Sequence, residues 1–357
     1  MRIAVAVSGG MDSLLALALL REECPDVVAV HAFFLPPDQG PKALSHKIAE
    51  QCALLDVPYH CLDLSTSFHE LVVTPFLSAY AAGLTPNPCA ECNRAIKFGL
   101  LQDRVFSQTG ADVLATGHYA DLQKDDGPAL VRGRDPVKDQ SYFLSLVPRF
   151  RLDRALFPLG TWHKKDVPDA LNVMGLSAPQ SRESQEICFV PGNDYRTYLT
   201  QHHPALSGPG EVQDARGKTL GRHLGLWAYT TGQRRGLGIA HASPLYVIGK
   251  DVKRNILRVG TREDLYVRGC IVREVNFLQN PKAWPRDVLV QTVYRQRPVP
   301  ARVTPTDTSL EIVFATPQKR PCPGQVGAVY TPEGRVLAGG IIDTVLEERN
   351  HQDPVSR

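Results

Sequence analysis

The first third of the chain alternates apolar strands with helices, and this alternation restricts the possible folds more than any other feature of the sequence. The expected strands are residues 2–7, 27–34, 59–64 and 113–116. The expected helices lie between them, one after Asp12 and the others at residues 41–55, 66–82 and 93–108. Strands that alternate with helices over short links predict an α/β domain with a doubly wound parallel sheet and right-handed crossovers.

The second part of the chain has the pattern of β-structure. Gly208, Pro209 and Gly210 interrupt the chain, and the apolar runs that follow are short, alternating and separated by Gly, Pro and Asp. They occupy residues 246–248, 256–259, 288–290, 310–314 and 326–329. This pattern predicts either one all-β domain or two small ones.

The composition is that of a globular protein. The 357 residues are 43% hydrophobic and 22% charged, which supplies a core for two or three domains and argues against disorder as the main state. No apolar run approaches the roughly 20 residues that cross a bilayer, and the N-terminal run is too short for a secretory signal. We therefore expect a cytoplasmic protein without a membrane partner.

Positive charge is concentrated in one segment. The net charge is only +3, which neither requires nor excludes nucleic acid. Residues 215–260, however, hold nine Lys and Arg against one acidic residue, Asp251. Such a block favours a polyanionic partner, and a solvated loop face is the alternative.

The glycine loop, S-G-G-M-D-S at residues 8–13, follows the first strand and opens the first helix. Glycines let the backbone turn tightly and approach an oxyanion, and the helix start offers free N–H groups with a partial positive charge. Ser8 and Ser13 add hydroxyl donors, and Asp12 would hold Mg²⁺ or orient the loop. The pattern predicts a phosphate-binding loop, and the alternative is an ordinary turn with Asp12 as the helix N-cap.

Two of the eight cysteines form a C-x-x-C pair, Cys89 and Cys92. We expect a helix to begin near Asn93, so that its dipole, together with Arg94 and Lys97, lowers the pKa of the Cys92 thiol and makes it a nucleophile or metal ligand. A structural zinc half-site is the alternative, but the sequence lacks a second pair with zinc-ligand spacing. Most of the other cysteines have the character of small buried hydrophobes.

Taken together, these motifs resemble those of a known family. The glycine loop is similar to that of the pyrophosphatase-loop ATPases, which cleave ATP between the α and β phosphates. The whole series, in its order along the chain, resembles the tRNA-specific 2-thiouridylases and extends from residue 6 to about residue 260. The matching segments are residues 8–13, 85–93, 115–120, 138–144, 187–189 and 230–237, with further agreement at 294–296 and 323–325.

The resemblance implies an ATP-dependent tRNA-uridine 2-sulfurtransferase that uses ATP and Mg²⁺. It would adenylate the C2 oxygen of the wobble uridine with release of pyrophosphate, and sulfur would then displace AMP. The sulfur donor would be a sulfur-relay protein or free sulfide. With the relay protein, Cys188 would receive a persulfide, and Cys92 would complete the transfer by forming a disulfide with Cys188. The implied substrates are the tRNAs for Lys, Glu and Gln.

One departure from the family pattern concerns Cys89. Many members have Asp at this position, where it is assigned an acid/base role for which a thiol is a weaker candidate. Cys89, Cys92 and Cys188 could instead supply three thiolates to a [4Fe–4S] cluster whose fourth iron holds hydrosulfide. The persulfide and cluster routes are both open on the sequence.

The resemblance also assigns binding residues. Those for the nucleotide are Ala6, Val7, Ser8, Gly9, Gly10, Met11, Asp12 and Ser13, with Gly117 and with Ala32 or Phe33 near the adenine. Those for tRNA are Asn87, Pro88, His118, Lys138, Asp139, Gln140, Gln233, Arg234, Arg235, Arg295, Gln296 and Gln325. His31 is expected to pack rather than to catalyse.

The implied domains are an ATP-binding catalytic domain of the adenine nucleotide alpha hydrolase type over residues 1–200, a small, mainly β, tRNA-binding domain over 201–270 and a C-terminal β-barrel over 271–357. Two other functions are open. A different adenylating ATPase, such as an argininosuccinate-synthetase-like ligase, shares the glycine loop but needs neither Cys92 nor Cys188. An RNA-binding module with a relic nucleotide site would bind tRNA without releasing pyrophosphate from ATP.

Overall fold

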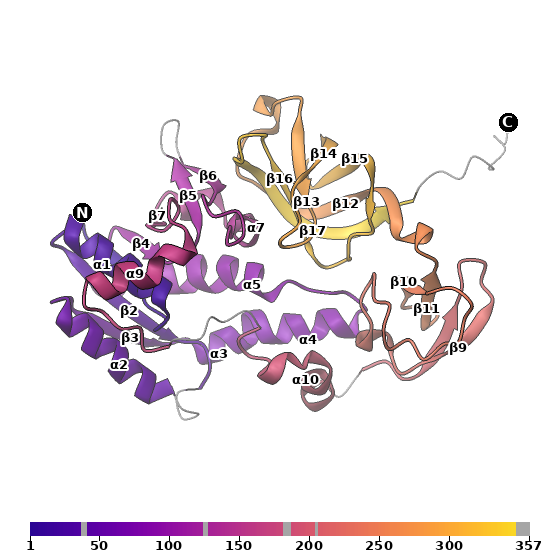
Figure 1. Ribbon diagram of the computed structural model, residues 1–357, viewed down its shortest axis with the longest axis horizontal. Helices are drawn as coiled ribbons and strands as arrows, with labels where there is room; N and C mark the ends of the chain where they lie inside the picture. The colour runs from indigo at the N-terminus through magenta and orange to yellow at the C-terminus, as the bar shows by residue number, and fades with distance from the viewer. Residues whose placement is uncertain (37–40, 124–127, 181–186, 204–205, 348–357) are drawn as a thin grey trace.

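Three β-structures follow one another along the chain (Figure 1). The computed structural model describes residues 1–36, 41–123, 128–180, 187–203 and 206–347. A five-stranded sheet comes first, a four-stranded sheet second and a closed barrel third. Within the described residues, none of the helices is long and apolar enough to span a bilayer.

The five-stranded sheet is parallel and has the order β3-β2-β1-β4-β7. Its strands are β1 (Ile3–Ala6), β2 (Val27–Phe33), β3 (Tyr59–Asp63), β4 (Val113–Thr116) and β7 (Ala155–Leu156). The strand order reverses between β1 and β4, and open α/β sheets bind ligands at the carboxyl ends of the strands at such a point. The predicted parallel sheet is confirmed, and the loops that follow β1 and β4 lie at its ligand-binding edge.

Helices connect and follow these strands. The first group is α1 (Met11–Glu23), α2 (Pro41–Leu54), α3 (Ser65–Phe68), η2 (His69–Val73), α4 (Thr74–Ala81), α5 (Pro88–Glu91), η3 (Cys92–Leu101) and α6 (Gln102–Thr109). The second group is α7 (Ser141–Leu144), α8 (Arg149–Leu152), η4 (Lys164–Asp166), α9 (Val167–Val173), η5 (Pro191–Asn193) and α10 (Tyr195–His202). A hairpin of β5 (Ala120–Gln123) and β6 (Ala129–Arg132) follows β4. The segments η2 and η3 are π-helical and continue directly into α4 and α6.

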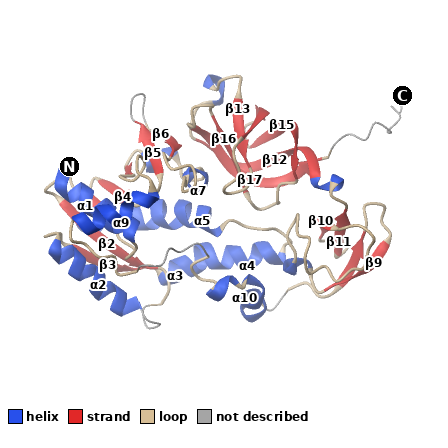
Figure 2. Cartoon of the chain, in the orientation of Figure 1, coloured by secondary structure: helices blue, strands red, loops and turns tan. Residues whose placement is uncertain are grey.

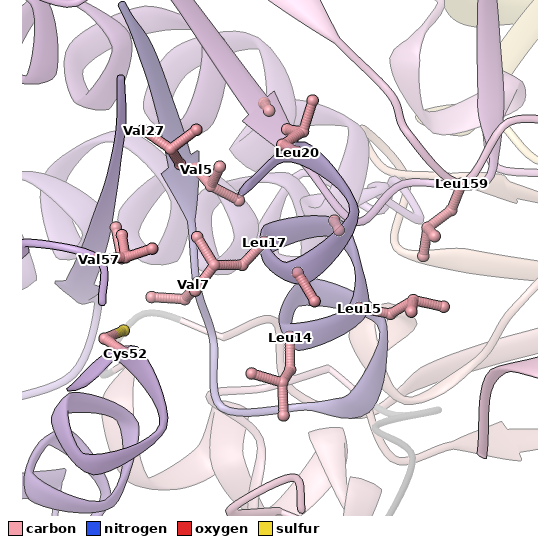
Figure 3. Packing of buried hydrophobic residues seen from close by; sticks show 14 of the residues in the cluster. Val5, Val7, Leu14, Leu15, Leu17, Leu20, Val27, Cys52, Val57 and Leu159 are labelled. Atoms are coloured by element: carbon pink, nitrogen blue, oxygen red, sulfur yellow. The ribbon is translucent and has the colours of Figure 1, made fainter. Parts of the chain in front are cut away.

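Helices cover both faces of the parallel sheet. Successive side chains of a strand point to opposite faces, so each apolar strand needs a packing partner on both. On one face, Val5 and Val7 belong to the apolar cluster that contains Leu17 of α1 (Figure 3). On the other face, Ala4 belongs to the cluster that contains Ile96 of η3. Because burial of each large aliphatic side chain stabilises the fold by about 1.5–3 kcal/mol, α1 and η3 are held firmly against the sheet.

The second half of the chain forms two separate β-structures (Figure 2). The four-stranded sheet consists of β8 (Gly210–Gln213), β9 (Thr219–His223), β10 (Tyr246–Asp251) and β11 (Ile256–Gly260), with η6 (Leu226–Ala228) and then η7 (Glu263–Leu265) beside it. The closed barrel consists of β12 (Tyr266–Phe277), β13 (Val288–Gln291), β14 (Val299–Pro305), β15 (Ser309–Lys319), β16 (Val326–Tyr330) and β17 (Val336–Leu346), with η8 (Pro281–Ala283) between β12 and β13. Of the two sequence-based alternatives, two small β-structures are therefore present.

The barrel packs against the first domain through a shared apolar cluster. Tyr142 and Leu144 of α7 are fully buried in this cluster together with Val326 and Tyr330 of β16. The Tyr142 hydroxyl also donates a hydrogen bond of 2.9 Å to the Val326 carbonyl oxygen. The segment 138–144 therefore contains residues that fix the barrel to the α/β domain.

Candidate active site

The glycine loop joins β1 to α1 at the carboxyl edge of the sheet, and its hydroxyl groups bond to its own backbone. The Ser13 hydroxyl donates to the Gly10 carbonyl oxygen at 3.0 Å and accepts from the Ser8 N–H at 3.1 Å. Gly9 has a φ of +89°, and a Cβ there would come within 2.8 Å of a leucine side chain of α2. A glycine at this position therefore lets α2 press against the loop and hold its shape.

The start of α1 has the character of an anion site. Gly10 is the N-cap residue and has no side chain to cap the first turn, and its own N–H donates to the Ser8 hydroxyl at 3.4 Å. The first N–H groups of the helix have no intrahelical partner, and the dipole adds a partial positive charge. The alternative with Asp12 as the N-cap is wrong, because Asp12 lies inside the first turn and its carboxylate binds other partners.

Two side chains from distant parts of the chain bind Asp12. The Tyr119 hydroxyl donates to Asp12 Oδ1 at 2.6 Å, and Lys164 Nζ donates to Oδ1 and Oδ2 at 2.6 and 2.7 Å. The side chains of Lys164 and Asp12 are 14% and 30% exposed. Sequence reasoning missed Tyr119 and Lys164 as site residues, because they follow Asp12 by 107 and 152 positions and no local motif links them.

Gly117 lies where a side chain does not fit. It follows β4, and a Cβ there would lie 2.8 Å from the carbonyl carbon of Asp12 and 2.9 Å from the Ser13 nitrogen. The end of β4 therefore packs directly against the backbone at the start of α1. This contact brings Gly117 together with the glycine loop, as expected for two parts of one nucleotide site.

His118 is buried between rings. Its Nδ1 lies 2.7 Å from Thr116 Oγ1, and its ring centre lies 6.0 and 5.9 Å from those of Phe98 and Phe157. Burial and, to a smaller extent, the charge of Lys97 hold the pKa of His118 well below its usual value. The imidazole is therefore neutral at pH 7, and a contact of His118 with tRNA stays a prediction.

The helix that carries the C-x-x-C pair begins earlier than predicted. Asn87 is its N-cap and accepts a hydrogen bond of 3.1 Å from the Ala90 N–H, with Pro88 in the first helical position. Cys92 consequently lies at the start of η3, one turn into the helix. An Asn followed by Pro is a favourable helix start, so the signal for this boundary is at residue 87 and not at Asn93.

The prediction that Cys92 has a lowered pKa is wrong. Cys92 is buried, with 7% exposure, and burial raises the pKa of its thiol to about 12, although the charge of Lys97 acts in the opposite direction. Arg94, expected to assist, forms hydrogen bonds of 2.7 and 3.0 Å with Glu91 instead. The position beyond the first turn also removes Cys92 from the free N–H groups that lower thiol pKa values at helix starts.

Cys89, Cys92 and Cys188 lie close enough for their charges to influence one another. Cys89 and Cys188 reach the surface, whereas Cys92 is buried. The surrounding protein still desolvates the first two, which raises their pKa, and the charge of Cys89 raises the pKa of the other two thiols. Lys97 is the cation that acts on all three.

A buried aromatic residue anchors the segment of Cys188. The Phe189 ring makes edge contacts with Phe68 and Phe76, with ring centres 5.7 and 5.1 Å apart. Phe189 and Cys92 belong to the same apolar cluster. Phe189 therefore anchors the segment 187–189 in the cluster that contains Cys92, and this holds the neighbouring Cys188 near the same helix.

The three thiols, as placed, do not fit a metal cluster. Within the described residues, no three His, Cys, Asp or Glu side chains converge as ligands for a metal ion. Residues 181–186, which come shortly before Cys188 in the sequence, lie outside the described residues. We therefore derive no chemical step through a [4Fe–4S] cluster.

A row of contacts joins the glycine loop to the helix that carries Cys92. The Gly117 backbone touches the start of α1, and the neighbouring His118 packs against Phe98 of η3. The charge of Lys97, on the same segment, affects both His118 and Cys92. The loop is therefore connected through Gly117 and His118 to η3, the segment that begins with Cys92.

The end of β2 carries the residues expected near the adenine. Ala32 and Phe33 are half-buried there. His31 is buried, and its Nδ1 lies 2.7 Å from the Val7 carbonyl oxygen, which confirms its packing role. Burial also lowers the pKa of His31. The contact of Ala32 with adenine stays a prediction.

Gln325 ties the barrel to the residues that precede the C-x-x-C helix. Its Nε2 donates to the carbonyl oxygens of Thr85 and Pro86 at 3.0 and 3.1 Å. Asn87 Nδ2 donates to its Oε1 at 3.4 Å. The fold thus gathers three predicted tRNA contacts, Asn87, the buried Pro88 and Gln325, although they lie far apart in the sequence.

Of the tRNA contacts predicted at residues 138–140, Asp139 and Gln140 direct their side chains to hydrogen bonds within the protein. Asp139 is buried, and its carboxylate accepts hydrogen bonds from Arg132 Nε at 2.7 Å and from the N–H and hydroxyl of Ser141 at 3.1 Å each. The Gln140 side chain accepts a bond of 3.0 Å from a backbone N–H between β4 and β5. Lys138 is half-buried. Asp139 and Gln140 shape this loop, and their contact with tRNA stays a prediction.

The basic segment of the four-stranded domain has exposed arginines on a shaped loop. The Gln233 side chain folds back, since its Oε1 accepts from the Thr230 N–H at 3.1 Å and its Nε2 donates to the Arg235 carbonyl oxygen at 2.9 Å. Arg234 and Arg235 are exposed. The loop 234–245 lines an open hollow of ≈ 600 Å³. Gln233 therefore holds the loop, and the two arginines carry its charge.

The remaining predicted contacts lie on the barrel. Arg295 is exposed, and its guanidinium lies 5.5 Å from the centre of the Tyr294 ring. Tyr294 in turn packs on Phe143 of α7, with ring centres 4.3 Å apart. The Gln296 side chain accepts bonds of 3.3 and 3.2 Å from the N–H and hydroxyl of Thr292. Gln296 thus braces the loop from which Arg295 projects.

Three family models match the chain in consecutive segments. The tRNA methyl transferase HUP domain matches residues 1–192, the tRNA methyl transferase PRC-barrel domain matches residues 196–261 and the aminomethyltransferase beta-barrel domain matches residues 267–342. The first two segments contain the parallel sheet and the four-stranded sheet, and the third contains most of the closed barrel. The expected fold class, an α/β domain followed by a small β domain and a β-barrel, is confirmed.

Curated relatives match over nearly the full chain. The tRNA-specific 2-thiouridylase MnmA of Nitratidesulfovibrio vulgaris is 53% identical over 96% of this chain and 99% of that protein. The protein of the same description from Oleidesulfovibrio alaskensis is 52% identical over 97% of this chain and 100% of that protein. Among solved structures, the U34-tRNA thiolase NcsA from Methanococcus maripaludis with its [4Fe-4S] cluster matches 57% of this chain and 67% of its own, with a TM-score of 0.35 and 18% identity. A likeness this slight bears on neither mechanism nor cofactor.

Proposed function

This chain belongs to the tRNA-specific 2-thiouridylase family, and from that premise we propose that it is an ATP-dependent sulfurtransferase that converts the wobble uridine of tRNA to 2-thiouridine. The observation that carries the chemistry is the row of contacts from the glycine loop through Gly117 and His118 to the helix of Cys92. ATP must activate, and sulfur must attack, the same C2 carbon of the uridine, so the two parts of the site have to be connected. This row of contacts supports such a connection.

The glycine loop would carry out the activation. The uridine C2 oxygen attacks the α-phosphorus of ATP, pyrophosphate leaves, and N3 of the base loses its proton. The free N–H groups at the start of α1 favour negative charge on the phosphates. Adenylation is needed because the C2 oxygen by itself is a poor leaving group, whereas AMP leaves readily.

The thiols would carry out the sulfur transfer. A relay protein loads Cys188 with a persulfide, whose terminal sulfur attacks C2 and expels AMP. The Cys92 thiolate then attacks the Cys188 sulfur and breaks the S–S bond, which releases 2-thiouridine and leaves a Cys92–Cys188 disulfide for an external thiol to reduce. The exposure of Cys188 and the burial of Cys92 support this division of roles.

The pKa of Cys92 bears on the timing of the transfer. Burial holds this thiol in its protonated, unreactive form in the free protein. Its activation therefore requires a change in its surroundings, and we propose that entry of the activated base or of the persulfide supplies this change. Cys89, whose pKa is also raised, is a poor base, so the acid/base role of the usual Asp is not transferred to it.

Exposed cations on the middle domain and on the barrel support binding of tRNA. Arg234 and Arg235 of the middle domain and Arg295 of the barrel would contact the RNA backbone. The wobble base must leave the anticodon stack to reach the thiols, as base-modifying enzymes require. We propose residues 1–200, 201–270 and 271–357 as the catalytic, tRNA-binding and barrel domains, and the tRNAs for Lys, Glu and Gln as substrates.

Mass spectrometry of tRNA nucleosides after anaerobic incubation with ATP and a persulfide-loaded relay protein tests the function. Wild-type protein should form 2-thiouridine without added iron. Free sulfide, which cannot become the outer sulfur of a Cys188 persulfide without an oxidant, is used with and without reconstituted iron to test the cluster route. Cys92→Ser and Cys188→Ser should abolish sulfur incorporation but retain tRNA-dependent release of pyrophosphate. Cys61→Ser is the matched control, because Cys61 is also an exposed free thiol but lies on β3.

Each competing function predicts a different result of this assay. Full turnover in both cysteine variants would indicate an adenylating ligase. Binding of tRNA without release of pyrophosphate would indicate an RNA-binding module. Formation of 2-thiouridine only after iron reconstitution, and its loss on iron removal, would replace the persulfide route by the cluster route.

A further inference from the structure

Lys164 forms an ion pair with Asp12 of the glycine loop, and the proposed reaction assigns Lys164 no role. Its Nζ lies 2.6 and 2.7 Å from the two carboxylate oxygens of Asp12. The ammonium is thus beside the first turn of α1, where the uncapped N–H groups of the helix begin. Among the described residues, Lys164 is the cation that the structure pairs with a member of this loop.

The backbone of Lys164 is fixed on two sides. Its N–H donates to Asp135 Oδ2 at 3.0 Å, and Asp135 is buried. The helix that follows, α9, packs its buried Val167 and Leu171 in the same cluster as α1 (Figure 1). The chain therefore keeps the lysine beside α1 while its flexible stem leaves the ammonium free to change partner.

A triphosphate brings more negative charge than the loop can neutralise. The loop donors are neutral N–H groups and the hydroxyls of Ser8 and Ser13, and the helix dipole contributes only about half a charge. Asp12 adds a negative charge at the same place. Since like charges repel strongly in a partly buried site, ATP needs a cation here, and the Lys164 ammonium is already in position.

We propose that Lys164 is the phosphate-binding cation of the nucleotide site, held by Asp12 in the free protein and transferred to the terminal phosphates when ATP binds. The inference rests on the proposed function, because it assigns a ligand to the ATP of that reaction. The ammonium exchanges one anionic partner for another, so no bare charge is left in the site. Asp12, still oriented by the Tyr119 hydroxyl, then offers its carboxylate to the Mg²⁺ that accompanies ATP.

The exchange distinguishes ATP from AMP. AMP has no terminal phosphates, so the ammonium stays with Asp12 and affects AMP affinity only by neutralising that carboxylate. A lysine that served only to hold the loop in shape would affect both nucleotides equally. The ratio of the two affinities therefore reports the phosphate contact itself.

Isothermal titration calorimetry of the full chain with ATP and AMP, both with Mg²⁺, measures this ratio. Lys164→Gln should weaken ATP binding by about 10- to 100-fold, the range for loss of a charged hydrogen bond, and weaken AMP binding much less. Lys164→Arg should restore most of the ATP affinity. Tyr119→Phe is the matched control, since it removes the other hydrogen bond to Asp12 but keeps the ammonium, and it should weaken ATP binding much less.

The other outcomes overturn the inference. Unchanged ATP affinity in Lys164→Gln would leave the proposed function intact and remove the role of Lys164. Equal losses in Lys164→Gln and Tyr119→Phe would show that the lysine acts only by holding Asp12. A parallel loss of AMP affinity would show a defect of loop structure. If wild-type protein binds no ATP, the proposed function fails, and the inference fails with it.

Discussion

Replacement of Gly117 by alanine tests whether the end of β4 must touch the start of α1 for the site to bind a nucleotide. The added Cβ would lie 2.8 Å from the carbonyl carbon of Asp12, whereas ordinary contact begins at 3.4 Å. The clash partners are backbone atoms of a helix start, which cannot rotate away as a side chain can. The strand end or the glycine loop must therefore shift by about 0.6 Å, the difference between these two distances.

The expected size of the effect follows from this shift. Overpacking at a tight contact costs about 1–3 kcal/mol of stability. A displacement above about 0.5 Å also exceeds the tolerance of a preorganised binding site. Gly117→Ala should therefore lower the unfolding temperature by a few degrees and weaken ATP binding by about tenfold or more.

Calorimetry provides both measurements, as thermal unfolding and as titration with ATP. Gly208→Ala is the matched control, because a Cβ at Gly208 meets nothing within 4 Å. The control should behave as wild type in both measurements. Wild-type ATP affinity together with wild-type unfolding of Gly117→Ala would refute the reasoning, since it would show that the close approach of the two backbones is not needed.

Three further measurements test the thiols, the basic loop and a half-buried lysine. Iodoacetamide should label Cys188 faster than Cys92 at pH 8, because Cys188 reaches the surface while burial raises the pKa of Cys92 to about 12; equal rates by peptide mass spectrometry would contradict this. Arg234→Ala should weaken tRNA binding and reduce the slope of log Kd against log salt concentration by about one, and unchanged affinity at several salt concentrations would exclude the contact. Burial lowers the pKa of Lys250 from 10.5 to about 8, so the unfolded chain binds more protons between these values and stability is lost as the pH falls from 10.5 to 8. Lys250→Met should therefore stabilise the protein at pH 7 by up to about 3 kcal/mol, and a calorimetric gain that does not shrink toward pH 10 would contradict this.

The parallel sheet and the glycine loop were predictable because their signals are local. A strand needs only a short apolar run, and the loop needs glycines between that run and a helix. The structure confirms the strands β1 to β4 close to their predicted bounds, and the first helix, expected after Asp12, begins at Met11. The start of the C-x-x-C helix was equally local, since Asn87 and Pro88 form a standard cap, but its prediction at Asn93 overlooked that signal.

The environment of the thiols was not predictable from their neighbours in the sequence. Arg94 and Lys97 lie close to Cys92 along the chain and suggested a lowered pKa. In the fold, Arg94 bonds to Glu91, and the apolar cluster around Ile96 buries Cys92 and raises its pKa. Desolvation depends on every residue that packs around the thiol, and most of those are distant in the sequence.

By itself, then, the sequence determined the layers of the fold, the position of the glycine loop at a strand end and, through its motifs, the family. Only the tertiary structure decided that Lys164 and Tyr119 bind Asp12, and that Gln325 forms hydrogen bonds with the residues before the C-x-x-C helix. The physical reason is the sequence separation over which each interaction acts. Backbone conformation is set by steric and hydrogen-bonding preferences within a few residues, whereas charge pairing and burial at a site depend on contacts that exist only once distant segments have packed together.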